Sequence, residues 1–218
     1  MKVRDRMTVN VKTIQLDSSI NDAFRIMNEN SFRRLPVMNQ KQQLVAIVTL
    51  SDLNQASPSN ATALSIHELN YLLARTKIKD ILTAKSKLMI IGPDEYIEAA
   101  ANVMIENKIS SLPVVDNGEL VGIITETDIF HALVEFLGVK KPHTRIDAYV
   151  ADQPGGLAEV TGLIAARGIN ILNTQLYYDE KLARYKVILR IDDLKQHQEI
   201  CRALTDHGYE IESIIVRP

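Results

Sequence analysis

Cysteine, tryptophan and aromatic residues in general are scarce in this chain of 218 residues. Cys201 is the single cysteine, so a disulfide within the chain is excluded. Trp is absent and aromatic residues make up 5% of the sequence, which argues against a groove in which the bases of single-stranded nucleic acid would stack. The formal net charge of −2 offers no basic field either. Nucleic acid is therefore not an expected partner.

Long apolar runs and targeting segments are also missing. No stretch approaches the roughly 18 apolar residues that a membrane-spanning helix needs. The opening segment MKVRDRMTVN is charged throughout and lacks the apolar stretch of a signal peptide. Hydrophobic residues nevertheless make up 46% of the chain, which is enough for real cores. We expect a cytoplasmic protein that does not associate with a membrane.

The residue patterns of common catalytic and metal sites are absent from the sequence. It contains no G-x-S-x-G, no Gly-Lys-Ser/Thr loop and no C-x-x-C. The five histidines do not fall at the spacing of metal ligands. Cys201 and Leu204 share one face of an expected helix, which favours a buried thiol over a nucleophile. We therefore expect no catalytic residue, no metal and no cofactor.

What the sequence does contain is an internal repeat. Four segments recur in the same order, at an offset of about 75 to 77 residues. They are VRDRMT (Val3–Thr8) with IKDILT (Ile78–Thr83), LDSSINDAFRIM (Leu16–Met27) with GPDEYIEAAANVM (Gly92–Met104), LPVMNQ (Leu35–Gln40) with LPVVDN (Leu112–Asn117), and LVAIVTLSDL (Leu44–Leu53) with LVGIITETDI (Leu120–Ile129). The shared order indicates a duplicated module.

Each copy is predicted to fold as roughly βαββα. Apolar residues at helical spacing mark a first helix, and Ser19 and Asp94 offer oxygens that could cap its start. The two Leu-Pro-Val segments begin short strands, and Asn117-Gly118 is a hairpin turn signal. The apolar runs that end at Thr49 and Thr125 predict buried strands, each followed by a second helix.

A Thr and an Asp stand together after each of these buried strands, as Thr49 with Asp52 and Thr125 with Asp128. A carboxylate there can accept hydrogen bonds from two hydroxyl groups, such as the 2′- and 3′-hydroxyls of ribose. A helix N-terminus also favours phosphate. The simpler interpretation is that both aspartates only cap helices. The two roles can coexist.

The tandem units, with their repeated LPV strand and strand-to-helix turn, resemble a CBS-domain pair over residues 1–140. The resemblance implies CBS repeat 1 at residues 1–60, a connecting helix at 61–77 and CBS repeat 2 at 78–141. It also implies two clefts for adenosine nucleotides, because the matching aspartate commonly holds ribose in that family. The implied residues of the first cleft are Arg34, Ile47, Thr49, Ser51, Asp52, Ile109 and Ser110. Those of the second are Phe32, Arg33, Ile123, Thr125, Thr127 and Asp128.

Arg33 and Arg34 form the only doubled base near either cleft, and the second copy has Ser110 and Ser111 instead. Arginine suits phosphate, so we expect unequal clefts, with that of Asp52 favouring more phosphate groups. The alternative is a solvated pair of charges. The segment QASPS (residues 55–59) and the following stripe of Ile66, Leu69, Leu72 and Leu73 resemble the acetoin-utilisation AcuB family.

After Pro142 the pattern becomes βαββαβ, which predicts a ferredoxin-like domain at residues 144–218. The whole chain is thus expected to mix α+β and α/β architecture. The D-Q-P-G-G-L turn and the later G-I-N-I segment resemble an ACT domain, which implies sensing of a small molecule, often an amino acid. The candidate ligand residues are Asp152, Gln153, Pro154, Gly155, Gly156, Leu157 and Asn170. The alternative is that these residues only form tight turns.

The expected function is that of a regulatory protein, without an active site, that senses adenosine nucleotides such as AMP, ADP or ATP. The resemblance further implies a homodimer and, as a partner, a regulated enzyme of acetate or acetoin metabolism. Two alternatives stay open. One is a structural dimerisation scaffold with non-functional pockets, and the other is an enzyme of acetoin catabolism.

Overall fold

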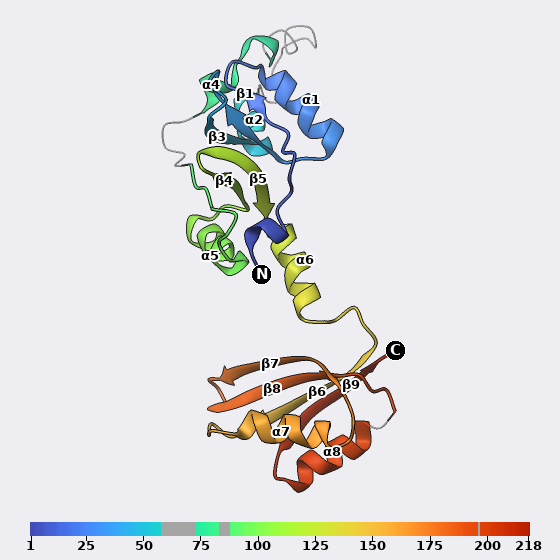
Figure 1. Cartoon of the computed structure of the whole chain (residues 1–218). Helices are drawn as coiled ribbons and strands as arrows, with labels where there is room; N and C mark the ends of the chain where they lie inside the picture. Colours follow the sequence, from blue (N-terminus) through green and yellow to red (C-terminus); the bar gives the residue numbers. More distant parts are fainter. Residues whose placement is uncertain (58–72, 83–87, 196) are drawn as a thin grey trace. The chain divides into compact units, whose positions relative to one another are not determined.

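The computed structural model describes residues 1–57, 73–82, 88–195 and 197–218. They form two compact units, Met1–Phe130 and His131–Pro218 (Figure 1). Most of the expected connecting helix, including Ile66, Leu69 and Leu72, lies outside the described residues.

The first copy of the repeat folds as βαββα after a short 3-10 helix. Its elements are η1 (Val3–Asp5), β1 (Ile14–Gln15), α1 (Ile20–Asn30), β2 (Arg34–Met38), β3 (Leu44–Thr49) and α2 (Leu50–Ala56). β2 is the middle strand, parallel to β1 and antiparallel to β3. β1 pairs only with Val37 and Met38, so Pro36 has a paired strand on one side alone and its missing N–H does not interrupt the sheet.

The second copy follows the same plan, but its first strand is shorter. Its elements are α4 (Ile78–Ile81), α5 (Ile97–Asn107), β4 (Ser111–Asp116), β5 (Glu119–Thr125) and α6 (Glu126–Phe136). Among the described residues, its first strand is reduced to one parallel bridge between Ile91 and Val114. Asn117 and Gly118 both have positive φ, at 47° and 86°, as the Asn-Gly turn signal predicts.

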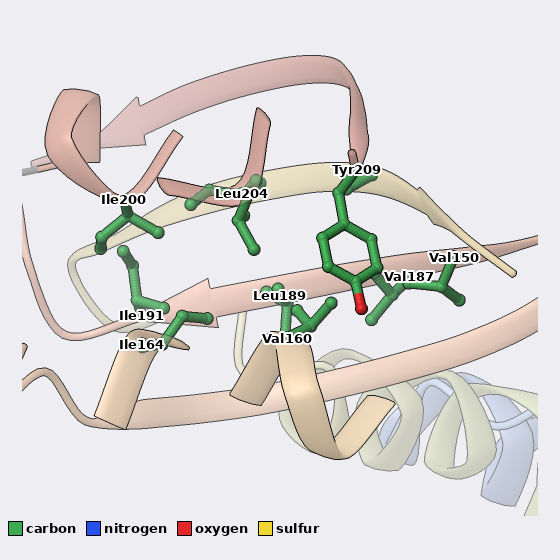
Figure 2. Close-up of a cluster of buried hydrophobic side chains, with 11 residues drawn as sticks. Val150, Val160, Ile164, Val187, Leu189, Ile191, Ile200, Leu204 and Tyr209 are labelled. Carbon is green, nitrogen blue, oxygen red and sulfur yellow. The ribbon is translucent and has the colours of Figure 1, made fainter. Parts of the chain in front are cut away.

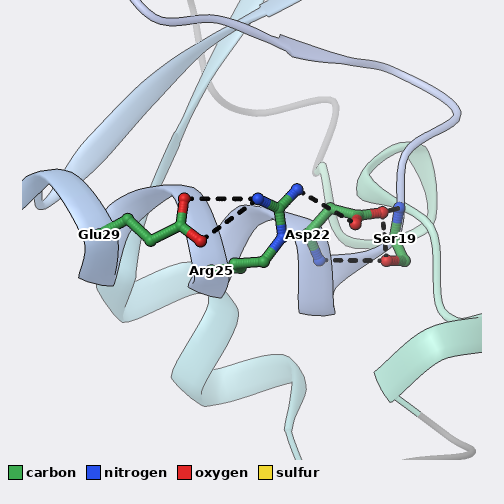
Figure 3. A network of polar contacts seen from close by, with 4 residues as sticks. All are labelled: Ser19, Asp22, Arg25 and Glu29. Atoms are coloured by element: carbon green, nitrogen blue, oxygen red, sulfur yellow. Dashed lines mark hydrogen bonds and ion pairs between the residues drawn. The ribbon is translucent and has the colours of Figure 1, made fainter.

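The two first helices begin differently. The Ser19 hydroxyl accepts a hydrogen bond from the Asp22 N–H at 3.1 Å, and the carboxylate of Asp22 accepts one from that hydroxyl at 2.6 Å (Figure 3). α5 begins after Tyr96, which makes no side-chain capping bond with any described residue. The prediction that Asp94 caps this helix was wrong, because Asp94 instead accepts hydrogen bonds from Lys2, at 2.7 Å, and Arg4.

The two copies exchange their opening segments. Val3 of the first copy is buried in the core of the second, and Ile78 of the second is buried in the core of the first. Backbone bonds follow the same exchange. Thr8 and Ile123 bond each other in both directions at 2.9 and 3.0 Å, and the Ile78 N–H donates to the Ser18 carbonyl at 2.9 Å. The exchange makes the two copies one folding unit.

The second unit has the expected ferredoxin-like βαββαβ plan. Its elements are β6 (His143–Val150), α7 (Gly156–Ala165), β7 (Ile171–Asp179), β8 (Arg184–Ile191), α8 (His197–Asp206) and β9 (Glu210–Arg217). The sheet order is β7-β8-β6-β9 with antiparallel neighbours, and α7 and α8 cover one face (Figure 1).

The core of the second unit lies between this sheet and its two helices. Val160 of α7 and Leu204 of α8 pack with Leu189 of the sheet (Figure 2). Cys201 is partly buried against the same cluster, and this burial raises the pKa of its thiol. A thiol with a raised pKa stays protonated and unreactive at neutral pH, which agrees with the interpretation of Cys201 as a core residue.

Candidate functional site

Two cavities of the first unit are lined by residues of both copies of the repeat. The larger has a volume of about 500 Å³ and contains Thr125, so we name it the Thr125 cavity. The smaller has a volume of about 280 Å³ and contains Thr49, so we name it the Thr49 cavity. In both, a strand end of one copy faces the segment that precedes the Leu-Pro-Val strand of the other copy.

The structure brings most of the predicted nucleotide residues into these two cavities. The Thr49 cavity contains Arg34, Ile47, Thr49, Asp52, Ile109 and Ser110. The Thr125 cavity contains Phe32, Arg33, Ile123, Thr125 and Thr127. Ser51 is exposed and is not among the lining residues of the Thr49 cavity. Asp128 does not itself line the Thr125 cavity but is bonded directly to Thr125.

Each Thr and Asp pair forms a capping box with one carboxylate oxygen. The N–H and the hydroxyl of Thr49 donate to Oδ2 of Asp52 at 2.8 and 2.7 Å, and the Asp52 N–H donates to the Thr49 hydroxyl at 3.2 Å. The corresponding distances for Thr125 and Asp128 are 2.8, 2.7 and 3.3 Å. No described residue donates a hydrogen bond to Oδ1 of either aspartate. Capping therefore uses Oδ2 and leaves Oδ1 able to accept donors from a ligand.

Arg34 connects the two copies. It pairs with Thr49 across β2 and β3, and its Nη2 donates to the hydroxyl of Ser110 at 2.5 Å. Burial lowers the pKa of the half-buried Arg34 guanidinium, and the nearby Glu126 carboxylate acts in the opposite direction. An arginine pKa starts so high that the side chain stays charged at neutral pH. The structure thus holds a partly desolvated cation where the two cavities adjoin.

The sequence did not predict two lysines of the cavities. Lys12 lines the Thr125 cavity and Lys108 lines the Thr49 cavity. Lys12 lies two residues before Ile14 of β1, and Met89 lies two residues before Ile91, the equivalent of Ile14 in the second copy. Met89 lines the Thr49 cavity. The repeat offset could therefore have identified Lys12. The segment before the first strand of each copy lines the cavity at the strand end of the other copy.

Positive charge gathers at the larger cavity. The Thr125 cavity is lined by Lys12, Arg33 and Arg34 with the carboxylate of Glu126. The Thr49 cavity is lined by Arg34 and Lys108 with the carboxylate of Asp52. The sequence-based expectation that the Asp52 cleft favours more phosphate groups rested on Arg34, which lines both cavities, so this expectation stays a prediction.

The candidate ligand loop of the second unit is formed by two turns. Asp152, Gln153, Pro154 and Gly155 are exposed, Gly156 is buried and Leu157 packs on the core. Gly155 has a φ of 95°, which favours glycine, and a Cβ on Gly156 would lie 3.2 Å from the Ala151 carbonyl oxygen. The exposed Asn170 accepts a backbone hydrogen bond from the Asp192 N–H at 2.9 Å. Backbone geometry accounts for both glycines, and a ligand role for this loop stays a prediction.

Within the described ranges, no group of His, Cys, Asp and Glu side chains is placed to hold a metal ion. None of the helices in that part of the chain combines the length and the apolar character that crossing a bilayer requires.

Family models match most of the chain. The model of the CBS domain matches residues 3–59 and 78–135, and that of the ACT domain matches residues 141–207. Among solved structures, the acetoin utilization protein AcuB of Vibrio cholerae is 28% identical with a TM-score of 0.51, over 65% of this chain and 98% of that chain. CBSX2, solved in complex with AMP, is 27% identical with a TM-score of 0.50, over 64% of this chain and 98% of that chain.

Curated relatives match part of the chain. The homoserine O-acetyltransferase of Methanosalsum zhilinae is 38% identical over 128 residues, which are 58% of this chain and 23% of that enzyme. An uncharacterized protein of Methanocaldococcus jannaschii is 34% identical in an alignment of 141 residues that covers 54% of this chain and 83% of that protein. The chain therefore spans less than a quarter of the length of the acetyltransferase it is similar to.

Proposed function

Because the chain belongs to the CBS-domain family and carries an ACT domain after its CBS pair, we propose that it is a regulatory protein that binds adenosine nucleotides in the Thr49 and Thr125 cavities. The nucleotide would be AMP, ADP, ATP or a related compound. The observation that carries the proposal is that two equivalent strand ends each open into a cavity completed by the other copy. The AMP complex of the similar CBSX2 supports this choice of ligand.

The lining residues divide into groups suited to the parts of a nucleotide. Oδ1 of Asp52, and that of Asp128 beside the lining residue Thr125, would accept hydrogen bonds from ribose hydroxyl groups. Apolar side chains such as Ile47 and Ile123 offer walls for the base. Arg34, Arg33 and the two lysines would bind phosphate oxygens, and one guanidinium can donate to two of these oxygens at once. Each part of the ligand thus has a chemical counterpart in the cavities.

The cavities are also suited to signalling. Because each is built from both copies, a nucleotide would bind best to one relative arrangement of the copies and so favour it. We propose that the ACT domain relays this change or adds a second ligand, bound at the loop from Asp152 to Leu157. We also propose a cytoplasmic homodimer and, as its target, an enzyme of acetate or acetoin metabolism.

We propose further that the chain has no active site of its own. Among the described residues, neither cavity is lined by a histidine or a cysteine, and the aspartates are held in capping boxes. The match to homoserine O-acetyltransferase covers 23% of that enzyme. The competing hypothesis is a structural scaffold whose cavities bind nothing.

A thermal-shift panel separates a sensor from a scaffold. The panel contains AMP, ADP, ATP and adenosine, with amino acids for the ACT domain and inorganic tripolyphosphate as a control for charge alone. A ligand at 100 times its dissociation constant stabilises the folded state by about 2.7 kcal/mol. We expect a rise in melting temperature with adenosine nucleotides and not with tripolyphosphate. No rise with any nucleotide would favour the scaffold.

A further inference from the structure

Arg34 and Ser110 line both cavities of the CBS pair. Their side chains are joined by the 2.5 Å hydrogen bond from Nη2 of Arg34 to the Ser110 hydroxyl. Arg34 is therefore part of the wall of the Thr49 cavity and of the wall of the Thr125 cavity. A ligand in either cavity would meet the same cation.

The repeat supplies only one such guanidinium. Ser111 occupies the position in the second copy that Arg34 occupies in the first, since Arg34 pairs with Thr49 and Ser111 pairs with Thr125. Ser111 is 3% exposed, and a serine hydroxyl carries no charge. The pair of cavities is therefore symmetric in its strand ends and asymmetric in this cation.

We propose that Arg34 serves one cavity at a time, so that phosphorylated nucleotides in the two cavities compete for it and weaken each other's binding. This inference rests on the proposed function and adds a regulatory property to it. A nucleoside without phosphate would bind the two cavities independently. The pair would then respond to polyphosphate nucleotides over a wider concentration range than two independent sites.

Charge and geometry both favour competition over simple sharing. The planar guanidinium grips phosphate oxygens best as a fork, and its orientation toward one cavity turns that fork away from the other. Its hydrogen bond to Ser110 gives it a defined position when neither cavity holds phosphate. Because the side chain is half-buried, its charge is screened less than that of an exposed cation. Coupling between the two sites is reciprocal, so either cavity weakens the other by the same factor.

Arg33 provides a matched control beside Arg34. It carries the same charge on the neighbouring residue, but it is exposed and, of the two cavities, lines only the Thr125 cavity. Removing the charge of Arg33 should weaken ATP binding to one cavity without changing the coupling. Removing the charge of Arg34 should change the coupling itself.

Isothermal titration of the full chain with ATP and with adenosine measures this coupling. The variants Asp52→Ala and Asp128→Ala each weaken one cavity and report the affinity of the other cavity alone. The coupling factor is the product of these two affinities divided by the product measured in the wild type. We expect a factor of about 10 for ATP, equivalent to about 1.4 kcal/mol, and no coupling for adenosine.

The Arg34 variants decide between competition and plain repulsion of phosphate groups. In Arg34→Gln, and in Arg34→Ser as a second neutral variant, the ATP coupling factor should fall toward 1, whereas Arg33→Gln should keep it. If nucleotides bind and the ATP coupling factor is the same in the wild type and in both Arg34 variants, the coupling comes from repulsion between phosphate groups. This result would overturn the inference and leave the proposed function standing. If neither ATP nor adenosine binds the wild type, the proposed function fails and the inference fails with it.

Discussion

Val3 and Ile78 occupy equivalent positions in the two copies of the repeat, and each side chain is fully buried in the core of the opposite copy. The exchange explains why the repeat forms one unit rather than two. It also places the segment that follows Val3, with Thr8 and Lys12, beside the Thr125 cavity of the second copy. The same contacts therefore support the fold and build the candidate site.

Truncation of either exchanged side chain should destabilise the whole first unit. Ile78→Ala should lower the free energy of unfolding by about 2–5 kcal/mol, and Val3→Ala by somewhat less, because each leaves a cavity in a buried core. The exposed Val9 is the control, since Val9→Ala should change it by less than about 0.5 kcal/mol. Urea unfolding measures the free energy of unfolding, and hydrogen exchange measures the protection of the backbone amides in each copy. Loss of protection in one copy alone would contradict the exchange.

The first unit should fold without the ACT domain. A fragment of residues 1–141 contains both exchanged segments and all the residues that line the two cavities. We expect it to give a cooperative unfolding transition and to bind adenosine nucleotides with the affinity of the full chain. A fragment that is folded but has lost nucleotide binding would show that the ACT domain contributes to the site. An unfolded fragment would show that the boundary is misplaced.

The two lysines should tune phosphate preference separately. Lys12→Gln should lower the ATP-to-adenosine affinity ratio of the Thr125 cavity by up to about fivefold, because one exposed ion pair contributes at most about 1 kcal/mol. Lys108→Gln is the matched variant for the Thr49 cavity. Titrations at low and high salt should show the loss shrinking with salt. An unchanged ratio in Lys12→Gln would remove this lysine from the phosphate contacts.

Tyr209 should make the ACT domain sensitive to alkaline pH. Its hydroxyl donates to the Glu159 carboxylate at 2.6 Å, and burial, followed by this bond, raises the pKa of Tyr209 from 10.0 to about 12. Because the folded pKa lies above the unfolded one, the stabilisation is complete below pH 10.0 and is lost as the pH rises toward about 12. Tyr209→Phe lacks this dependence. The variant should be less stable by about 1 kcal/mol at pH 7, with the difference closing or reversing above pH 10.0.

Urea unfolding followed by circular dichroism at pH 7 and pH 11 measures the Tyr209 effect. The wild type and Tyr209→Phe differ in this hydroxyl alone, so the difference between the two proteins isolates its effect. A difference that is the same at both pH values would show that the Tyr209 pKa is not raised.

Much of the fold could be predicted from the sequence. The repeat marks the two copies, and the spacing of apolar residues along each segment indicates its strands and helices. The Asn117-Gly118 turn and the Ser19 helix start are examples, since their own side chains and backbone preferences decide them. The prediction that Asp94 caps α5 was wrong because its partners are distant in the sequence. Its carboxylate is engaged by Lys2 and Arg4 from more than 80 residues away, a contact that no local pattern contains. The exchange of Val3 and Ile78 is equally non-local.

The candidate site was predicted in part for a similar reason. Thr49 and Thr125 could be paired with their cavities because the repeat marks both strand ends and the family resemblance supplies the facing segments. Lys12 was missed because it lies before the first strand, where the two copies have different residues. The double position of Arg34 depends on how the copies pack, and the sequence of either copy alone does not contain that information.

Calorimetric titration of Asp52→Ala, Asp128→Ala and the double variant with ATP and adenosine tests the central claim most directly. Each single variant lacks a charge-assisted hydrogen bond to ribose, so the binding free energy of the ligand in one cavity should become less favourable by about 1.5–3 kcal/mol. The double variant should lose most measurable binding of both ligands, while Ser51→Ala, which changes an exposed residue outside the cavity lining, should bind as the wild type does. Unchanged affinities for both ligands in a folded double variant would contradict nucleotide binding at these two cavities.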